Sequence, residues 1–169
     1  DPRSAGFFRE MISRIQSMGL IHTMLYQSDL YSQVDFKEYI RRITGNLESL
    51  YISDGGRRTI AIDMDTIHFH IDTAIPCGLI INELVSNALK HAFPDGRNGT
   101  IRISMKRLPD ERIELHVKDD GIGIHKDFDI RDTDSLGLMI VRLLVERQLS
   151  GYVDLRIEKG TEFVINFSG

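Results

Sequence analysis

Apolar positions near the start of the chain recur at the spacing of an α-helix. Between about residues 4 and 28 they alternate at intervals of three and four, at Phe8, Met11, Ile15, Met18, His22 and Leu25. Such a stripe is typical of a helix that packs on another helix. After a turn-like segment over 27–33, Asp35 can cap a second helix that continues to about Tyr51, and the Ser-Asp-Gly-Gly run at 53–56 ends it. We therefore predict a helical arm over residues 1–52.

The remainder of the chain, residues 53–169, changes to a pattern of alternating strands with two helices among them. The predicted helices cover 74–93, with Pro76 in the first turn, and 136–149. Strand-like alternation covers 59–63, 66–71, 99–107, 112–118, 152–157 and 162–167. The pair joined by the turn at 108–111 reads as antiparallel. Strands grouped against segregated helices favour an α+β sandwich behind the arm.

Composition excludes some classes of protein but does not by itself indicate a function. The 169 residues are 41% hydrophobic and 27% charged, which suits one ordinary domain with some extra length. A net charge of −4 gives no broad basic face, so we expect no nucleic-acid binding. No apolar run approaches the roughly 18 to 20 residues of a membrane span, so we expect no membrane contact and a cytoplasmic location. Because the chain begins at Asp1 without methionine, we expect a piece of a longer protein.

Cysteine and histidine usage gives little sign of redox or metal chemistry. Cys77 is the single cysteine and stands in an apolar helix start, so we interpret it as a buried, inert thiol. His68 and His70 share one strand face, but no other ligand stands at a suitable spacing, and a structural role is favoured over a metal site. His22 falls on the apolar stripe, and a core histidine is favoured there over a phosphorylated one.

Four polar residues on the helix at 74–93 stand at intervals of three and four and share one edge: Glu83, Asn87, Lys90 and His91. The amide oxygen of Asn87 is a hard ligand suited to Mg²⁺. Glu83 can hold a metal-bound water or accept a proton, Lys90 can reach phosphate oxygens, and His91 can line a ribose. The alternative is an ordinary amphipathic helix whose polar edge is solvated.

Two later segments offer groups that suit a purine nucleotide. Asp119 ends a strand before Gly121 and Gly123, so its carboxylate can accept the exocyclic amine of adenine where side-chain-free backbone approaches the ligand. Asp120 is expected to point elsewhere. The alternative is a simple turn. The pattern is not a Rossmann fingerprint, and no Walker A motif occurs.

The segment at 135–138 and the start of the last strand offer further groups that suit a nucleotide. Gly137 stands in the first turn of a helix that Asp134 or Ser135 can cap, and free amides there can receive phosphates. Thr161 can donate its hydroxyl to adenine directly or through water. A plain capped helix and a simple turn are the respective alternatives.

Taken in chain order, these motifs resemble the N, G1, G2 and G3 boxes of the ATPase superfamily shared by sensor histidine kinases, gyrase, mismatch-repair ATPases and heat-shock chaperones. The motifs are Glu83-x-x-x-Asn87, Asp119-x-Gly121-x-Gly123, Leu136-Gly137-Leu138 and Gly160-Thr161. The residues within these motifs are most similar to those of two-component histidine kinases of the HWE and HisKA_2 type, and the resemblance covers residues 58–168. Residues 14–28 and 34–40 resemble the second dimerisation helix and the connector of that family.

The resemblance implies a Bergerat fold, a two-layer α/β sandwich with a mixed, mainly antiparallel sheet that binds ATP with Mg²⁺. It implies that Asn87 binds Mg²⁺, Lys90 the phosphates and Asp119 the adenine, with Ile124 packed on the base. Gly121, Gly123, Leu136, Gly137, Leu138 and Thr161 would surround the nucleotide. The implied reaction transfers the γ-phosphoryl of ATP to a histidine, for relay to an aspartate of a response regulator receiver domain. The stripe residues Phe8, Met11, Ile15 and Met18 predict a homodimer.

Two departures from the family pattern bear on the function. The ATP lid between Gly123 and Ser135 is short and polar, and the acceptor-histidine motif of the first dimerisation helix does not occur. We therefore expect this chain to bind ATP and Mg²⁺ without phosphorylating itself. A gyrase- or chaperone-type hydrolase, in which Glu83 activates water, and a non-enzymatic module whose association is controlled by nucleotide are the two alternatives.

Overall fold

The computed structural model describes residues 2–26, 33–52, 57–125 and 127–168. Its helices are α1 (Pro2–Tyr26), α2 (Phe36–Tyr51), α3 (Ile71–His91) and α4 (Leu136–Leu143), with short 3-10 turns η1 (Pro94–Gly96) and η2 (Ile130–Asp132) and a π-helical turn η3 (Leu144–Gln148). Its strands are β1 (Gln33–Asp35), β2 (Arg58–Met64), β3 (His68–His70), β4 (Gly99–Arg107), β5 (Arg112–Asp119), β6 (Tyr152–Glu158) and β7 (Gly160–Ser168).

Five strands form one sheet in the order β2-β4-β5-β7-β6. β2 runs parallel to β4, and the other three pairings are antiparallel. The register aligns one apolar row across all five strands, through Ile62, Ile103, Val117, Phe163 and Leu155. Side chains alternate between the two faces of a strand, so this row faces the helices while Glu114, His116 and Glu162 lie on the other face. The predicted α+β sandwich with a mixed, mainly antiparallel sheet is confirmed.

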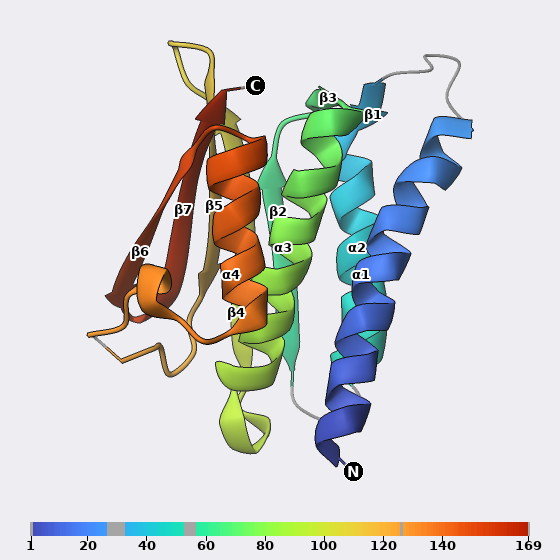
Figure 1. Cartoon of the computed structure of the whole chain (residues 1–169). Coiled ribbons are helices and arrows are strands. Elements are labelled where there is room, and N and C mark those ends of the chain that lie inside the picture. Colours follow the sequence, from blue (N-terminus) through green and yellow to red (C-terminus); the bar gives the residue numbers. More distant parts are fainter. Residues whose placement is uncertain (1, 27–32, 53–56, 126, 169) are drawn as a thin grey trace.

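The helices form the second layer and extend past the sheet (Figure 1). α3 and α4 lie over the sheet, α2 lies beside α3, and α1 lies outermost. α2 packs on α3 because its apolar residues recur at helical spacing, at Phe36, Tyr39, Ile40, Ile43 and Leu47, all of which are buried. The predicted boundary near residue 52 falls beside residues 53–56, which lie outside the described residues, and it stays a prediction. Within the described residues α2 and α3 share one core.

The predicted cap of the second helix is confirmed. Asp35 precedes α2 in an extended conformation, and its Oδ1 accepts a hydrogen bond of 3.1 Å from the backbone N–H of Glu38. This bond satisfies one of the backbone donors that a helix start leaves without an intrahelical partner. The Ser-Asp-Gly-Gly run that was expected to end this helix lies outside the described residues.

The start of α3 corrects three predictions. The strand expected over 66–71 is confined to His68–His70, where it pairs with β1, a three-residue strand that the turn-like reading of 27–33 did not anticipate. The helix begins at Ile71 instead of residue 74, so Pro76 lies in its second turn, not its first. The burial of Pro76, Cys77 and Gly78 against neighbouring elements outweighs the unfavourable proline. Burial also raises the pKa of the Cys77 thiol, in keeping with an inert cysteine.

The outer helix α1 turns its apolar stripe away from the rest of the fold. Phe8, Met11, Ile15 and Met18 are exposed, whereas Ser13 and Ser17 are buried against α3. The side chains of His22 and Leu25 lie outside the described residues. No helix in the described ranges combines the length and apolar character that crossing a bilayer requires.

Replacement of Asp35 tests the role of the cap. Asp35→Ala removes the acceptor for the Glu38 N–H and should lower the free energy of unfolding by about 1 kcal/mol, measured by urea denaturation. Asp35→Asn keeps a side-chain oxygen in the same place and should retain most of the stability. Equal losses in the two variants would show that the capping bond does not stabilise α2.

Candidate functional site

A pocket of about 270 Å³ opens between α3, the segment that follows β5 and the start of β7. Its lining joins residues that are far apart in the sequence: Leu84, Asn87, Ala88, His91, Ala92, Val117, Asp119, Gly123, Ile124, Phe128, Thr133, Ser135, Leu138, Thr161 and Phe163. Seven of the predicted site residues are among them, namely Asn87, His91, Asp119, Gly123, Ile124, Leu138 and Thr161. The walls are mainly apolar, with a few convergent polar groups, which is the usual composition of a small-molecule pocket.

Asp119 provides the buried carboxylate of the pocket. It ends β5 on the inward side of the strand and is 6% exposed. Its Oδ1 accepts hydrogen bonds from the backbone N–H of Gly121 at 2.9 Å and of Thr161 at 3.3 Å. Burial raises the pKa of Asp119, and these hydrogen bonds oppose the rise. The next carboxylate, Asp120, points away as expected, and its Oδ1 accepts a 2.7 Å bond from the backbone N–H of Thr100.

The glycine loop is attached to the end of α3. The Ile122 N–H donates to the Ala92 carbonyl at 3.0 Å, and a Cβ at Gly121 would lie 2.3 Å from the same carbonyl oxygen. Gly121 is therefore required for the packing of the loop on α3, and it does not line the pocket. Gly123 does line the pocket and has a φ of +75°, a conformation that favours glycine.

The polar edge of α3 divides between two environments. Asn87 and His91, one turn apart, line the pocket. Lys90 does not line it, and its Nζ lies 5.6 Å from the centre of the Tyr51 ring, a cation–π contact with the end of α2. Position 90 is rotated by about 100° from position 91 on a helix of 3.6 residues per turn, which places the two side chains on different sides of α3.

Glu83, one turn before Asn87, contacts the arm instead of the pocket. Arg14 of α1 donates from Nε to Glu83 Oε1 and from Nη2 to Oε2, the latter at 2.9 Å. The Glu83 residue is 4% exposed. Gly137 packs against this carboxylate, because a Cβ there would lie 2.6 Å from Glu83 Oε2. The predicted site residues Glu83, Gly137 and Leu136 thus lie outside the lining of the pocket, and Leu136 is exposed.

The lid segment contributes an aromatic wall that the sequence reading of a polar lid missed. Phe128 lines the pocket together with Thr133 and Ser135. The turn that follows Phe128 is held by the buried side chain of Ile130 and by an Arg131–Asp129 ion pair of 2.6 Å. Ser135 occupies the N-cap position of α4, but its side chain makes no capping hydrogen bond. The four N-terminal amides of a helix have no intrahelical partner, and those of α4 begin at the edge of the pocket.

Metal-binding groups are few around the pocket. The described residues contain no cluster of three or more His, Cys, Asp or Glu side chains that could hold a metal ion. The Asn87 amide is the predicted Mg²⁺ ligand that does line the pocket. A magnesium ion that keeps waters and binds nucleotide phosphates needs only one or two protein ligands, so this side chain fits the expected donor.

Comparisons with known proteins agree with this geometry. Residues 72–168 match the family described as histidine kinase-, DNA gyrase B- and HSP90-like ATPase, and residues 1–51 match a family described as histidine kinase. The fold is thus the α+β fold of this ATPase class. More specifically, the chain belongs to the histidine kinase-, DNA gyrase B- and HSP90-like ATPase family, and its arm matches the histidine kinases.

Individual relatives are sensor kinases. The chain is 35% identical over 161 residues to the sensor histidine kinase PdtaS of Mycobacterium tuberculosis, covering 92% of this chain and 31% of that protein. It is 33% identical over 108 residues to blue-light-activated histidine kinase 2 of Erythrobacter litoralis, covering 64% and 31%. The histidine kinase domain of the E. litoralis EL346 blue-light-activated kinase has the same fold, with a TM-score of 0.84 at 24% identity, over 97% of this chain and 81% of that one. The chain spans 31% of the length of the curated relatives named here.

The buried carboxylate predicts a pH dependence of stability. Because the folded-state pKa of Asp119 is raised, its contribution to the free energy of unfolding is full below the ordinary carboxylate pKa of about 4 and is lost as pH rises through the folded-state value. Asp119→Asn keeps the acceptor for Gly121 and Thr161 without the charge. Relative to this variant, the wild-type chain should lose stability in urea denaturation as the pH rises above the ordinary carboxylate pKa of about 4. If the difference in free energy of unfolding between the two proteins stayed constant with pH, burial would not raise the pKa of Asp119.

Proposed function

We propose that this chain is the ATP-binding catalytic part of a two-component sensor histidine kinase. It transfers the γ-phosphoryl of ATP to a histidine on the first dimerisation helix of the parent protein, for relay to an aspartate of a response regulator receiver domain. The observation that carries the proposal is the pocket itself, where Asn87, Asp119 and Thr161 converge from three separate elements. The histidine kinase match of residues 1–51 supports a kinase over other members of the ATPase class.

The pocket supports a definite orientation of the nucleotide. Adenine lies at the Asp119 end, where the carboxylate accepts from the exocyclic amine and the apolar walls of Ile124 and Phe128 pack on the ring. The phosphates extend toward the N-terminus of α4, whose free amides favour anions. His91 lines the ribose side. Lys90 serves the phosphates only after leaving the Tyr51 ring, which makes it a secondary ligand in this proposal.

The chemistry is an in-line phosphoryl transfer. An imidazole nitrogen attacks the γ-phosphorus, the bond between that phosphorus and the β–γ bridging oxygen breaks, and ADP leaves. The Asn87 amide would hold Mg²⁺, which when bound would supply positive charge near the transferred group. Glu83, one turn from Asn87, accepts the imidazole proton when its carboxylate is available.

A hydrolase that uses Glu83 to activate water and a non-enzymatic nucleotide-controlled module are less well supported. The match of residues 1–51 to histidine kinases gives the arm a role that the other two functions do not require. Because the substrate is ATP, we assign the reaction to the cytoplasm.

We also propose that α1 forms a homodimer contact. The stripe residues Phe8, Met11, Ile15 and Met18 are 62%, 41%, 64% and 46% exposed, and Ile12 beside them is 51% exposed. A contiguous apolar face of this kind is stabilised when a second copy covers it.

A nucleotide titration on variants tests the two ends of the proposed ligand. Asp119→Ala should weaken ATP binding about tenfold or more, from the loss of a charged acceptor in a buried site, and should abolish the preference for ATP over GTP. Asn87→Ala should remove the part of the affinity that depends on Mg²⁺. Asp120→Ala is the matched control, since that carboxylate binds the Thr100 N–H outside the pocket. If Asp119→Ala kept the wild-type affinity for ATP and the preference for ATP over GTP, the proposed adenine site would be wrong.

The homodimer is tested by the solution mass of a stripe variant. Wild-type chain should sediment as a dimer at micromolar concentration, and Ile15→Glu should sediment as a monomer because it places a charge within the apolar contact. Gln16→Glu adds the same charge beside the stripe and should remain dimeric. A wild-type mass that is monomeric at every concentration would refute the contact.

A further inference from the structure

The outer helix α1 contacts α3 through polar side chains. Ser13 Oγ donates to Asn82 Oδ1 at 2.8 Å, and Ser17 Oγ lies 3.1 Å from the same oxygen. The Tyr39 hydroxyl of α2 donates to the Ser17 carbonyl at 2.8 Å. Ser13, Ser17 and Asn82 are buried. The face of α1 that packs on α3 is therefore small and polar, opposite in character to its exposed apolar stripe.

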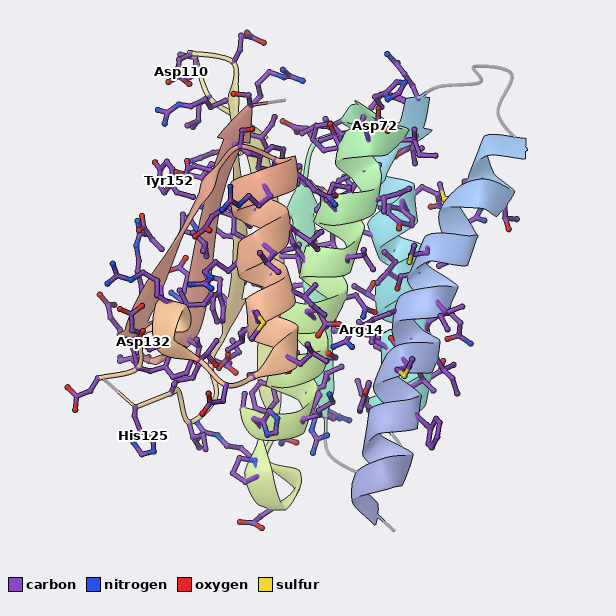
Figure 2. All side chains as sticks on the ribbon, in the orientation of Figure 1. Arg14, Asp72, Asp110, His125, Asp132 and Tyr152 are labelled. Carbon is purple, nitrogen blue, oxygen red and sulfur yellow. The ribbon has the colours of Figure 1, made fainter. Side chains whose placement is uncertain are left out.

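The Arg14–Glu83 ion pair lies next to these hydrogen bonds. Figure 2 shows Arg14 between α1 and α3. The side chains are 15% and 5% exposed, and the guanidinium engages both carboxylate oxygens. Paired donors of this kind match the geometry of a carboxylate and fix its orientation. Gly137, at the start of α4, packs on Glu83, so the arm, α3 and the phosphate end of the proposed site meet at this pair.

Engagement by Arg14 has a direct consequence for Glu83. A carboxylate that accepts a proton, or orients a metal-bound water, needs an oxygen directed at that group. Here the paired donors of Arg14 engage both oxygens and fix the orientation of the carboxylate, with Oε2 packed against Gly137. Asn87 lines the pocket one turn further along α3, whereas Glu83 does not. In this arrangement the proposed metal ligand Asn87 lines the pocket, whereas the proposed proton acceptor Glu83 is bound to Arg14.

The surroundings of the pair favour reversible contact. Hydrogen bonds of serine and asparagine contribute little net stability, because water replaces them when the surfaces separate. Contacts between domains that move relative to one another are typically polar in this way. Among the α1 side chains that the structure describes, Leu20 and Met24 pack against the core, and both are only partly buried. The contact around Arg14 is therefore able to open without exposing a large apolar surface.

We propose that Arg14 is a positioning residue through which the arm controls Glu83, and that phosphoryl transfer requires the Arg14–Glu83 ion pair to open. This inference rests on the proposed function, because it assigns Glu83 a part in transfer. Movement of α1, which lies within the region that matches the histidine kinase family, would then make the carboxylate available.

The test measures three quantities on the full chain and its variants. These are the Kd for ATP with Mg²⁺, the rate of phosphoryl transfer from saturating ATP to an added dimerisation domain that carries an acceptor histidine, and amide hydrogen exchange across α1. The variants are Arg14→Ala, Arg14→Lys, Ser17→Ala, Glu83→Gln and the Arg14→Ala/Glu83→Gln double variant. Arg42→Ala is the matched control, because it breaks an exposed arginine–glutamate pair within α2, with Glu38, away from the site.

The proposal makes a distinct prediction for each variant. Arg14→Ala should raise the transfer rate by roughly five- to tenfold, the lower range of coupling between sites, with Kd unchanged and faster exchange in α1. Arg14→Lys keeps the charge without the paired donors and should fall between wild type and Arg14→Ala. Ser17→Ala should change in the same direction by loosening the contact. Glu83→Gln should abolish transfer whether Arg14 is present or absent, and Arg42→Ala should match wild type.

Two outcomes separate failure of this inference from failure of the proposed function. If the wild-type chain transfers phosphate but Arg14→Ala and Ser17→Ala transfer at the same or a lower rate, the control by Arg14 is wrong and the kinase remains. If the wild-type chain binds ATP but no variant phosphorylates the added domain, the proposed function is wrong and the role of Arg14 falls with it. Circular dichroism identifies a variant that fails to fold. If Arg14→Ala does not fold, the transfer rates of Arg14→Lys and Ser17→Ala test the control by Arg14.

Discussion

The burial of α3 on several sides is the constraint on which the rest of the structure depends. This helix packs on the sheet, on α2, on α1 and on α4, so most of its circumference is covered and only a narrow edge can carry solvated groups. Asn87 and His91 occupy that edge beside the pocket. Because the core fixes the rotation of α3, it also fixes which polar side chains of α3 face the pocket and which face α1. The geometry of the site is thus a consequence of core packing.

A second constraint is the cost of placing a carboxylate in an apolar pocket. Asp119 is held by two backbone donors, and their contribution only partly offsets the effect of burial on its pKa. A carboxylate kept in this environment gains from a ligand that donates hydrogen bonds to it, as the adenine amine does. In the proposed site, a ligand that donates a hydrogen bond to Asp119 would therefore offset part of the cost of burying this carboxylate. The outward carboxylate Asp120 carries no such cost, since it stabilises the adjoining strand through Thr100.

Much of the fold could be predicted from sequence because its elements follow simple periods. The strand at 99–107 was predicted at its observed bounds, since its apolar residues alternate cleanly and turns flank it. β1 was missed because three residues are too few to show alternation. The start of α3 was placed three residues late because Pro76 resembled a first-turn proline, whereas tertiary burial tolerates it in the second turn.

The candidate site was predictable where one motif supplies one group, and less so where distant segments meet. Asn87, Asp119 and Thr161 could be chosen from their residue types and local context. The position of Phe128 in the pocket could not be predicted, because a single aromatic residue in a polar segment gives no periodic pattern that shows which way its side chain faces. The Arg14–Glu83 pair joins residues 69 positions apart, and no local pattern reveals such a contact. Lys90 was assigned to phosphate from the family motif, while its rotation on α3 directs it to Tyr51.

A crystal structure with a non-hydrolysable ATP analogue and Mg²⁺ would show whether these separated segments form one site for the nucleotide and its metal. The proposed site predicts the adenine amine on the Asp119 carboxylate, the ring between Ile124 and Phe128, and the metal on the Asn87 amide. A nucleotide bound on another surface, or one with its base at Asn87 and its phosphates at Asp119, would contradict it.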